Sequence, residues 1–397
     1  MSARSLDALF DPAVIAVVGA SSHPGKLGAA MRQSLRSFPG PVLAVNARGG
    51  DPGSGTHPSL AAAVAATGAR PDLVVSCVPA SATATALREA AAHGARAALV
   101  CAGGFAEIGG TGLALQAELA DVVSTTGLRL LGPNTSGFLV PARSLAASFV
   151  PGVTAVPGGP VAVVAASGGM NHALAFALAG RGSGIRLGVG LGNCVDVDAA
   201  DVLEHLLGDK EVRAVALHVE SVGDGRRLVD VISRLSERIP VAALVVGRSD
   251  VGDFARSHTG ALATSWRTTR AALRQAGAVL VDDDRQLVDA VSALSLRRLL
   301  PTAQPGVGLV TGQAGPGLLI ADALRSASVE LPELRPETVA TLATLLPPLT
   351  TSSTRSTPGG RTTGLCRRCW RPSGTTRAST SSACTPCSSR TPSTCRS

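Results

Sequence analysis

Short apolar runs alternate with longer amphipathic segments along most of this chain. The first run, AVIAVV at 13–18, leads into the glycine-bearing turn GASSHPGKLG at 19–28 and then into a helix expected at 27–35. An apolar run of about four to eight residues between turn-forming residues is typical of a strand covered on both faces of a parallel sheet. The opening of the chain therefore predicts a strand, a tight turn and a helix that follow one another directly.

Further strands and helices are predicted at the interval that βαβ units require. In the first part of the chain the expected strands are 41–45, 73–78, 97–101 and 128–131, with helices at 82–93 and 112–125. In the second part the expected strands are 161–165, 187–191, 213–219 and 241–246, with a helix at 199–207. Strands that alternate with helices in this way predict an α/β fold with parallel, doubly wound sheets.

Proline and glycine residues mark where one predicted domain ends and the next begins. We expect a first domain at 1–140, a proline-bearing linker at 141–160 and a second domain at 161–298. A third unit, expected at 306–350, opens with an apolar run near 307–310 and is predicted to be incomplete. The chain is long enough for two or three domains that each bury a core.

The last stretch, 351–397, differs in composition from the rest of the chain. It is rich in Ser, Thr, Pro, Arg and Cys and contains no Lys, Asp or Glu. We interpret it as disordered or as a gene read out of frame, because so few aliphatic residues cannot build a core. The pairs Cys366/Cys369 and Cys384/Cys387 have zinc-ribbon spacing, but the same lack of a core argues against a metal site.

The formal net charge of +8 originates in that tail, which holds eight arginines and no acid. The remaining 28 Lys and Arg equal the 28 Asp and Glu of the chain, so the body has no basic bias and no nucleic-acid partner is expected. No apolar run reaches the ~18 residues of a membrane span, and the first ten residues lack the apolar core of a signal peptide. We therefore expect a cytoplasmic protein without a membrane partner.

His258 is the candidate for the chemistry. It follows the predicted strand 241–246 and precedes a predicted helix, and open α/β sheets bind their ligands in loops at the carboxyl ends of strands. Glu220 follows strand 213–219 at the same edge, where its carboxylate can orient the imidazole and favour its protonation. The alternative is that His258 is an ordinary surface or structural histidine. None of the other six histidines shows metal-ligand spacing, so we predict no metal site.

The glycine turn at 19–28 is a candidate phosphate cradle, because glycine lets the backbone approach a phosphate and a helix start offers free N–H groups. The strand at 41–45 ends in Asn46-Ala47-Arg48, where an NAD-binding fold usually places an acid. The cation favours a ligand with an additional ribose phosphate, such as coenzyme A or NADP. The alternative is that Arg48 is a solvated loop charge.

Three acids follow strand 187–191, namely Asp196, Asp198 and Asp201. Their spacing is compatible with a cation site. We favour the simpler interpretation that Asp198 and Asp201 cap the helix predicted at 199–207.

From residue 6 to about 350 the chain resembles the NDP-forming acyl-CoA synthetases, which are relatives of the succinyl-CoA ligase alpha subunit. Nine stretches carry this resemblance in the same order along the chain: VVGASSHPGKLG, CVPA, GGFAEIG, LLGPNTSGF, AASGGMNHAL, LGNCVDVDAADVLEHL, HVESVGDGRRL, VVGRSDVGDFARSHTGALA and VTGQAGPG. The resemblance implies a Rossmann-like CoA-binding domain followed by flavodoxin-like domains of the succinyl-CoA ligase type, the last of them incomplete.

The resemblance also implies roles for individual residues. His258 would be phosphorylated transiently, Glu220 would steady it, and Ser167, Gly168 and Gly169 would seat the phosphoryl group at a helix start. The residues that would bind coenzyme A are Gly19, Ser21, Ser22, Lys26, Gly28, Arg48, Val78, Pro79 and Asn134. Among them, Asn134 would line the acyl or CoA end.

The activity implied by the resemblance is a reversible acid–thiol ligation. A carboxylic acid and ATP would pass through an acyl phosphate to an acyl-CoA, with His258 relaying the phosphoryl group. The sequence shows no ATP-grasp region, so ATP or ADP and Mg²⁺ would be bound by an ATP-grasp beta subunit or a missing portion, within a homo- or hetero-oligomer. The alternative is a non-catalytic CoA-binding sensor or scaffold, and Asn46 disfavours a dehydrogenase.

Overall fold

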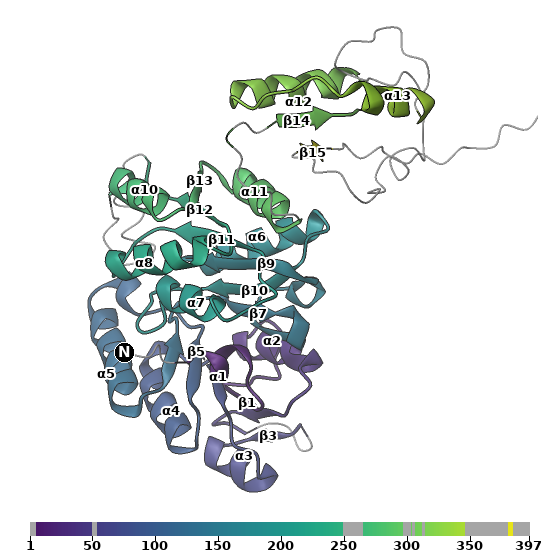
Figure 1. Cartoon of the computed structure of the whole chain (residues 1–397). Coiled ribbons are helices and arrows are strands. Elements are labelled where there is room, and N and C mark those ends of the chain that lie inside the picture. The colour runs from purple at the N-terminus through teal and green to yellow at the C-terminus, as the bar shows by residue number, and fades with distance from the viewer. Residues whose placement is uncertain are drawn as a thin grey trace, which may run out of the picture. The chain divides into compact units, whose positions relative to one another are not determined.

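The computed structural model describes residues 5–49, 54–248, 265–296, 303, 306–311, 314–345 and 380–383 (Figure 1). Its chain divides into two compact units, Met1–Arg297 and Arg298–Ser397, which are described separately below. Among the helices that the structure describes, none combines the length and hydrophobicity that a membrane span requires.

The first sheet is fully parallel and has six strands in the order β3-β2-β1-β4-β5-β6. These strands are β1 (Ile15–Val18), β2 (Val42–Val45), β3 (Thr56–His57), β4 (Leu73–Ser76), β5 (Ala97–Val100) and β6 (Arg129–Leu131). The strand order reverses between β1 and β4, and ligands of open α/β sheets bind beyond the carboxyl ends of the strands at such a reversal. The turns after β1 and β4 are therefore the expected ligand-binding turns of this sheet.

Helices connect these strands and cover both faces of the first sheet (Figure 1). They are α1 (Asp7–Phe10), α2 (Leu27–Ser34), α3 (Leu60–Thr67), α4 (Ala80–Ala92) and α5 (Thr111–Thr126), with short 3₁₀ turns η1 (Leu35–Ser37) and η2 (Ala106–Ile108). Helix α3 begins where the Ser59 hydroxyl accepts a hydrogen bond from the N–H of Ala62, and it ends at Gly68 in the left-handed conformation. A side-chain cap and a terminal glycine are the local features that define such helix ends.

The second sheet has seven strands in the order β13-β12-β11-β9-β10-β7-β8. The strands are β7 (Gly137–Val140), β8 (Leu145–Ser148), β9 (Gly158–Ala165), β10 (Ile185–Gly190), β11 (Ala214–Val219), β12 (Val241–Val245) and β13 (Val279–Val281). Five are parallel, whereas β7 runs antiparallel to both β10 and β8. The helices of this sheet are α6 (Gly168–Gly180), α7 (Ala199–Leu206), α8 (Gly225–Ser236), α10 (Trp266–Gln275) and α11 (Asp284–Leu296).

Three buried clusters hold the first unit together, because alternate strand residues point to opposite faces of each sheet. One face of the first sheet packs with α3, α4 and α5, and one face of the second packs with α6 and α11. The remaining face of each sheet contributes to a shared core with α1, α2, α7 and α8. The α/β class with parallel sheets that the sequence predicts is therefore confirmed.

Residues 141–160, where the prolines and glycines predict a linker, are built into the second sheet. They contain η3 (Pro141–Arg143), β8, η4 (Val153–Ala155) and the start of β9. The side chains of Leu145 and Ala147 are buried, since β8 pairs with β7 as an antiparallel hairpin. The apolar run LAASFV explains the difference, because its residues gain more from burial in the sheet than from exposure in a linker.

The second unit is described in part. It contains β14 (Gly306–Leu309), α12 (Ala314–Ser326), α13 (Pro336–Leu345) and β15 (Thr380–Ala383), with β14 parallel to β15. Apart from β15, the tail at 351–397 lies outside the described residues, so its interpretation stays a prediction.

We predict that Gly28→Ala destabilises the protein. A Cβ at this position would collide with the carbonyl oxygen of Gly19, which is backbone and cannot swing aside, so α2 would have to move away from the turn. Such overpacking costs about 1–3 kcal/mol of unfolding free energy, measured by urea denaturation. Gly180→Ala is the control, because nothing lies near its Cβ position and alanine is the better helix former. Equal stabilities of Gly28→Ala and the wild type would contradict the prediction.

Candidate functional site

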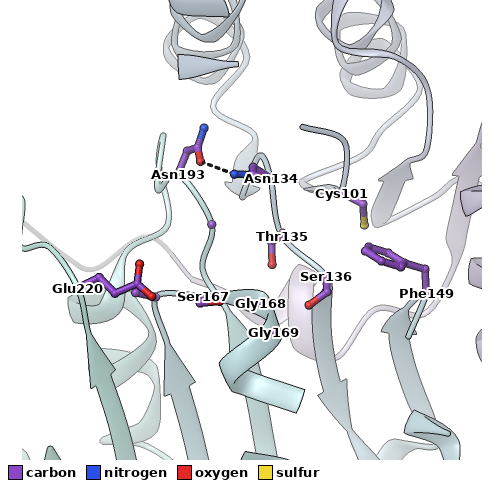
Figure 2. Close-up of a pocket in the computed structure, with 12 residues that line it drawn as sticks. Cys101, Asn134, Thr135, Ser136, Phe149, Ser167, Gly168, Gly169, Asn193 and Glu220 are labelled. Carbon is purple, nitrogen blue, oxygen red and sulfur yellow. Dashed lines mark hydrogen bonds between the residues drawn. The ribbon is translucent and has the colours of Figure 1, made fainter. Parts of the chain in front are cut away.

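A cavity of about 190 Å³ opens at the carboxyl ends of the strands, where loops from the two sheets meet (Figure 2). Its walls come from the segments that follow β5, β6, β8, β9, β10 and β11. The lining residues are Cys101, Asn134, Thr135, Ser136, Phe149, Ala166, Ser167, Gly168, Gly169, Gly192, Asn193 and Glu220. The structure thus brings together Asn134, the Ser167–Gly169 turn and Glu220, which the sequence places far apart.

The start of α6 forms one wall of this cavity. Ser167 is the N-cap residue in an extended conformation, and its side chain makes no capping hydrogen bond. The first N–H groups of a helix have no acceptor within the helix, and the helix dipole adds positive potential there. A Cβ on Gly168 would collide with Ser136, so glycine lets the helix start lie directly against the loop before β7. This wall suits an anion such as a phosphoryl group.

Glu220 lines the same cavity directly after β11, and its side chain lies beside Ser167 (Figure 2). The two residues are neighbours because β11 pairs with β9, with His218 opposite Ala165. Its Oε1 lies 3.9 Å from Nε2 of His218, whose side chain is only 3% exposed. Burial lowers the pKa of His218 to about 4, so this imidazole is neutral near pH 7. His218 therefore does not offer the Glu220 carboxylate a cationic partner at neutral pH.

His258 lies outside the described residues, so its position stays a prediction. The described residues on either side of its segment are nevertheless held together. Trp266, the first residue of α10, donates a hydrogen bond from Nε1 to the carbonyl oxygen of Val245, the last residue of β12, over 3.0 Å. Because β12 pairs with β11, this junction lies at the sheet edge that also carries Glu220.

A chain of amide hydrogen bonds crosses the rim of the cavity between the two sheets. Asn193 donates from Nδ2 to Oε2 of Glu107 over 2.7 Å and to Oε1 of Gln116 over 2.9 Å. Its Oδ1 therefore accepts from Nδ2 of Asn134, over 3.2 Å (Figure 2). The other Glu107 oxygen accepts the N–H of Phe105 over 3.1 Å. Both amides are thus oriented by an anion that lies behind the rim.

The acids after β10 are structural, as the sequence favours. Asp198 caps α7, because its side chain accepts a hydrogen bond from the backbone N–H of Asp201 over 2.9 Å. The Asp201 side chain in turn accepts one from the backbone N–H of Asp198. Asp196 and Asp201 also contact the buried guanidinium of Arg129, with Nε 2.8 Å from Asp196 Oδ2. In the part of the chain that the structure describes, no group of His, Cys, Asp and Glu side chains could hold a metal ion.

The glycine turn after β1 forms a separate group at the strand-order reversal of the first sheet. Gly19 has φ +89°, and a Cβ there would lie 2.9 Å from the backbone of Cys77, so the turn requires glycine. Asn46 ties the end of β2 to this turn by donating from Nδ2 to the carbonyl oxygen of Ala20 over 2.9 Å. The Arg48 side chain is exposed, and the backbone N–H of Arg48 donates to Oδ1 of Asn46 over 3.1 Å.

The other predicted CoA-binding residues flank the same turn. Ser21 holds the turn by accepting the N–H of His23, whereas Ser22 and Lys26 are exposed. Val78 and Pro79 follow β4, which pairs with β1. None of these residues lines the cavity described above.

Sequence reasoning missed several cavity residues, chiefly Cys101, Thr135, Ser136, Phe149 and Asn193. The stretches GPNTSGF and LGNC contain three of them, but no local pattern shows that the two stretches meet. Their proximity depends on strand order.

Comparison with known proteins gives one family match for the region of each of the two sheets. Residues 13–141 match the family described as CoA binding domain, and residues 158–294 match the Succinyl-CoA ligase like flavodoxin domain. The alpha subunit of acetate–CoA ligase [ADP-forming] II from Pyrococcus furiosus is 31% identical over 347 residues, which are 87% of this chain and 74% of that protein. The chain belongs to the NDP-forming acyl-CoA synthetase family.

Within this family the chain corresponds to the alpha part. Its structure resembles that of the dinucleotide-forming acetyl-coenzyme A synthetase 1 from Ca. Korarchaeum cryptofilum in complex with phosphate and ADP, with a TM-score of 0.78 and 28% identity. That match covers 87% of this chain and 74% of the other. Acetate–CoA ligase [ADP-forming] I from Archaeoglobus fulgidus is 33% identical over 345 residues, which are 86% of this chain but only 49% of that longer protein.

We predict that Glu107→Gln weakens the rim and changes its pH dependence. Burial alone would raise the pKa of Glu107, but hydrogen bonds from Asn193 and from backbone N–H groups outweigh it and lower the pKa. A carboxylate with a lowered pKa stabilises the fold above its unfolded pKa of about 4.3, and this stability is lost as the pH falls through the folded pKa. The free energy of unfolding of the variant should be about 1–3 kcal/mol lower than that of the wild type at pH 7, because a donor amide group replaces an acceptor oxygen.

The measurement is urea denaturation of the Glu107→Gln and wild-type proteins between pH 3 and pH 7. The difference between them should shrink towards acid pH. A difference that stays constant over this range would show that the ionised carboxylate does not hold the rim. Glu211→Gln, at an exposed position after α7, is the control and should match the wild type.

Proposed function

We propose that this chain carries the acyl-CoA half-reaction of an NDP-forming acyl-CoA synthetase. In the direction of acyl-CoA breakdown, inorganic phosphate attacks the thioester, giving an acyl phosphate and releasing CoA as the thiol. An imidazole nitrogen of His258 then takes the phosphoryl group, and the carboxylic acid leaves. Transfer from the phosphohistidine to ADP completes the reaction, and every step is reversible.

One observation carries this proposal: the start of α6 and the carboxylate of Glu220 line the same cavity. The side chain of Ser167, the N-cap residue of α6, makes no capping hydrogen bond there. A phosphoryl group at this helix start would meet backbone N–H donors, which compensate its charge without requiring a cationic side chain. Glu220 would accept the N–H of one His258 nitrogen and leave the other nitrogen free to attack phosphorus. The hydrogen bond between Trp266 and Val245 supports this role, because it holds the described residues before and after the His258 segment at the same sheet edge.

The glycine turn of the first sheet is the proposed seat of coenzyme A. The match of residues 13–141 to a CoA-binding family supports this assignment, as does the position of the turn where the strand order reverses. Gly19 and Gly28 shape the turn, and Ser21 holds it. Ser22 and Lys26 are exposed on the turn, and Val78 and Pro79 flank it. Arg48 would pair with the phosphate on the adenosine ribose.

The nucleotide half-reaction is assigned to a partner. The Pyrococcus relative is an alpha subunit, and this chain matches only about half of the longer Archaeoglobus protein. We therefore infer that an ATP-grasp beta subunit or an additional portion of the protein binds ADP or ATP with Mg²⁺. The partner would receive the phosphoryl group from His258 within a homo- or hetero-oligomer.

We predict that the full chain gains one phosphoryl group from acetyl-CoA and inorganic phosphate, and that His258→Ala abolishes the gain. Intact-mass analysis at alkaline pH detects it, because phosphohistidine is labile in acid. Glu220→Gln should slow the gain at least about a hundredfold, since a poorly oriented imidazole attacks less often. His93→Ala, at the end of α4, is the control. A chain that binds CoA but is never phosphorylated would instead be a CoA-binding sensor or scaffold.

We predict that Arg48→Ala weakens CoA binding about tenfold, the cost of losing one charge-assisted hydrogen bond. The variant and the wild type should bind dephospho-CoA equally, because that ligand lacks the ribose phosphate. Isothermal titration calorimetry with both ligands makes the comparison. An equal loss of affinity for CoA and for dephospho-CoA would show that Arg48 does not bind the ribose phosphate.

A further inference from the structure

A buried histidine connects three elements behind the cavity. His172 lies on α6 and is only 3% exposed. Its Nδ1 lies 2.8 Å from the carbonyl oxygen of Gly168 and 3.0 Å from Oγ of Ser136, the residue before β7. Its Nε2 lies 2.9 Å from Oγ of Ser148, the last residue of β8. Ser136 lines the cavity, whereas His172 and Ser148 lie behind it.

The partners of this imidazole determine which nitrogen carries the hydrogen. Burial lowers the pKa of His172, so the ring is neutral near pH 7 and has one N–H. The carbonyl oxygen of Gly168 can only accept a hydrogen bond, so the hydrogen belongs on Nδ1. The unprotonated Nε2 then accepts the hydroxyl hydrogen of Ser148. Oγ of Ser148 in turn accepts the N–H of Val150 over 3.2 Å.

This assignment determines the direction of the Ser136 hydroxyl. Since Nδ1 of His172 carries a hydrogen, Oγ of Ser136 can only accept there, and its own hydrogen must point elsewhere. The Ser136 side chain is directed towards the start of α6 (Figure 2). A Cβ on Gly168 would collide with that Oγ, so the hydroxyl lies directly against the first residue of the helix. Rotation about the Cβ–Oγ bond then lets this hydrogen point into the cavity, beside the first residue of α6.

The neighbouring hydroxyl is already used within the protein. Thr135 donates its hydroxyl hydrogen to the carbonyl oxygen of Gly190 and accepts the N–H of Gly137. Ser136 differs because its oxygen is occupied by a donor while its hydrogen is left for the cavity. A residue held in this way is a preorganised donor, which loses little freedom when an anion binds.

We propose that Ser136 donates its hydroxyl hydrogen to a phosphoryl oxygen bound at the start of α6, and that His172 and Ser148 are positioning residues that hold it in this role. The inference rests on the proposed function, which seats the phosphoryl group at Ser167–Gly169. The ligand class is a tetrahedral phosphate, either inorganic phosphate or the phosphoryl group of an acyl phosphate.

The first test measures the affinity of the full chain for inorganic phosphate. The ³¹P NMR line width of phosphate during a titration monitors the binding. Ser136→Ala should weaken binding roughly tenfold, because it removes one hydrogen bond to a charged ligand. Ser233→Ala, on the exposed face of α8, is the matched control and should bind like the wild type. Equal affinities of Ser136→Ala and the wild type, or a wild type that binds no phosphate, would overturn the inference.

The second test determines the tautomer of the His172 imidazole directly and needs no variant. ¹⁵N NMR of histidine-labelled wild-type protein at pH 7 should show His172 as the neutral tautomer with its hydrogen on Nδ1. A merely structural packing role does not demand this tautomer. Finding the hydrogen on Nε2 would overturn the inference, since Ser136 would then donate to His172 and have no hydrogen for a ligand.

The two proposals can fail separately. If wild type and Ser136→Ala become phosphorylated on His258 with the same dependence on phosphate concentration, the inference fails and the proposed function stands. If phosphate binding weakens in Ser136→Ala but acetyl-CoA never phosphorylates His258 in the wild type, the proposed function fails and the inference stands.

Discussion

The site depends on the direct approach of backbone segments at the carboxyl edge of the second sheet. Gly168 lies so close to Ser136 that a Cβ would collide with it, and a Cβ on Gly192 would collide with the carbonyl oxygen of Pro133. These contacts bring the start of α6, the loop before β7 and the loop after β10 together around one cavity. Any side chain at these positions would separate the three segments, so the cavity exists because glycine occupies them.

Polar side chains then determine what the cavity presents to a ligand. Glu107 orients the Asn193 amide from behind the rim, and Asn193 orients Asn134. On the other side, His172 holds Ser136 between α6 and β8. In both cases a side chain that does not line the cavity orients the donors and acceptors of one that does. Rigid positioning of this kind is what phosphoryl transfer requires of a protein.

The two sheets divide the proposed work between them. The first sheet provides a glycine turn at its strand-order reversal, and the second provides a helix start and a carboxylate. Loops from both sheets line the cavity, with Cys101 and Asn134 coming from the first and Glu220 from the second. The CoA part of an acyl-CoA must be bound while its thioester carbon lies next to phosphate, so an acyl-CoA synthetase has a physical reason to place its chemistry where two domains meet.

The sequence by itself determined the features that depend on local patterns. Apolar runs located the strands, as at β12, and Asp198 was correctly expected to cap α7, because burial patterns and capping involve neighbouring residues. Only the tertiary structure decided that 141–160 joins the second sheet, that His172 reaches Ser136, and that Asn193 reaches Glu107, 86 positions away. A polar side chain takes its role from a distant partner, and strand order rather than local pattern selects that partner.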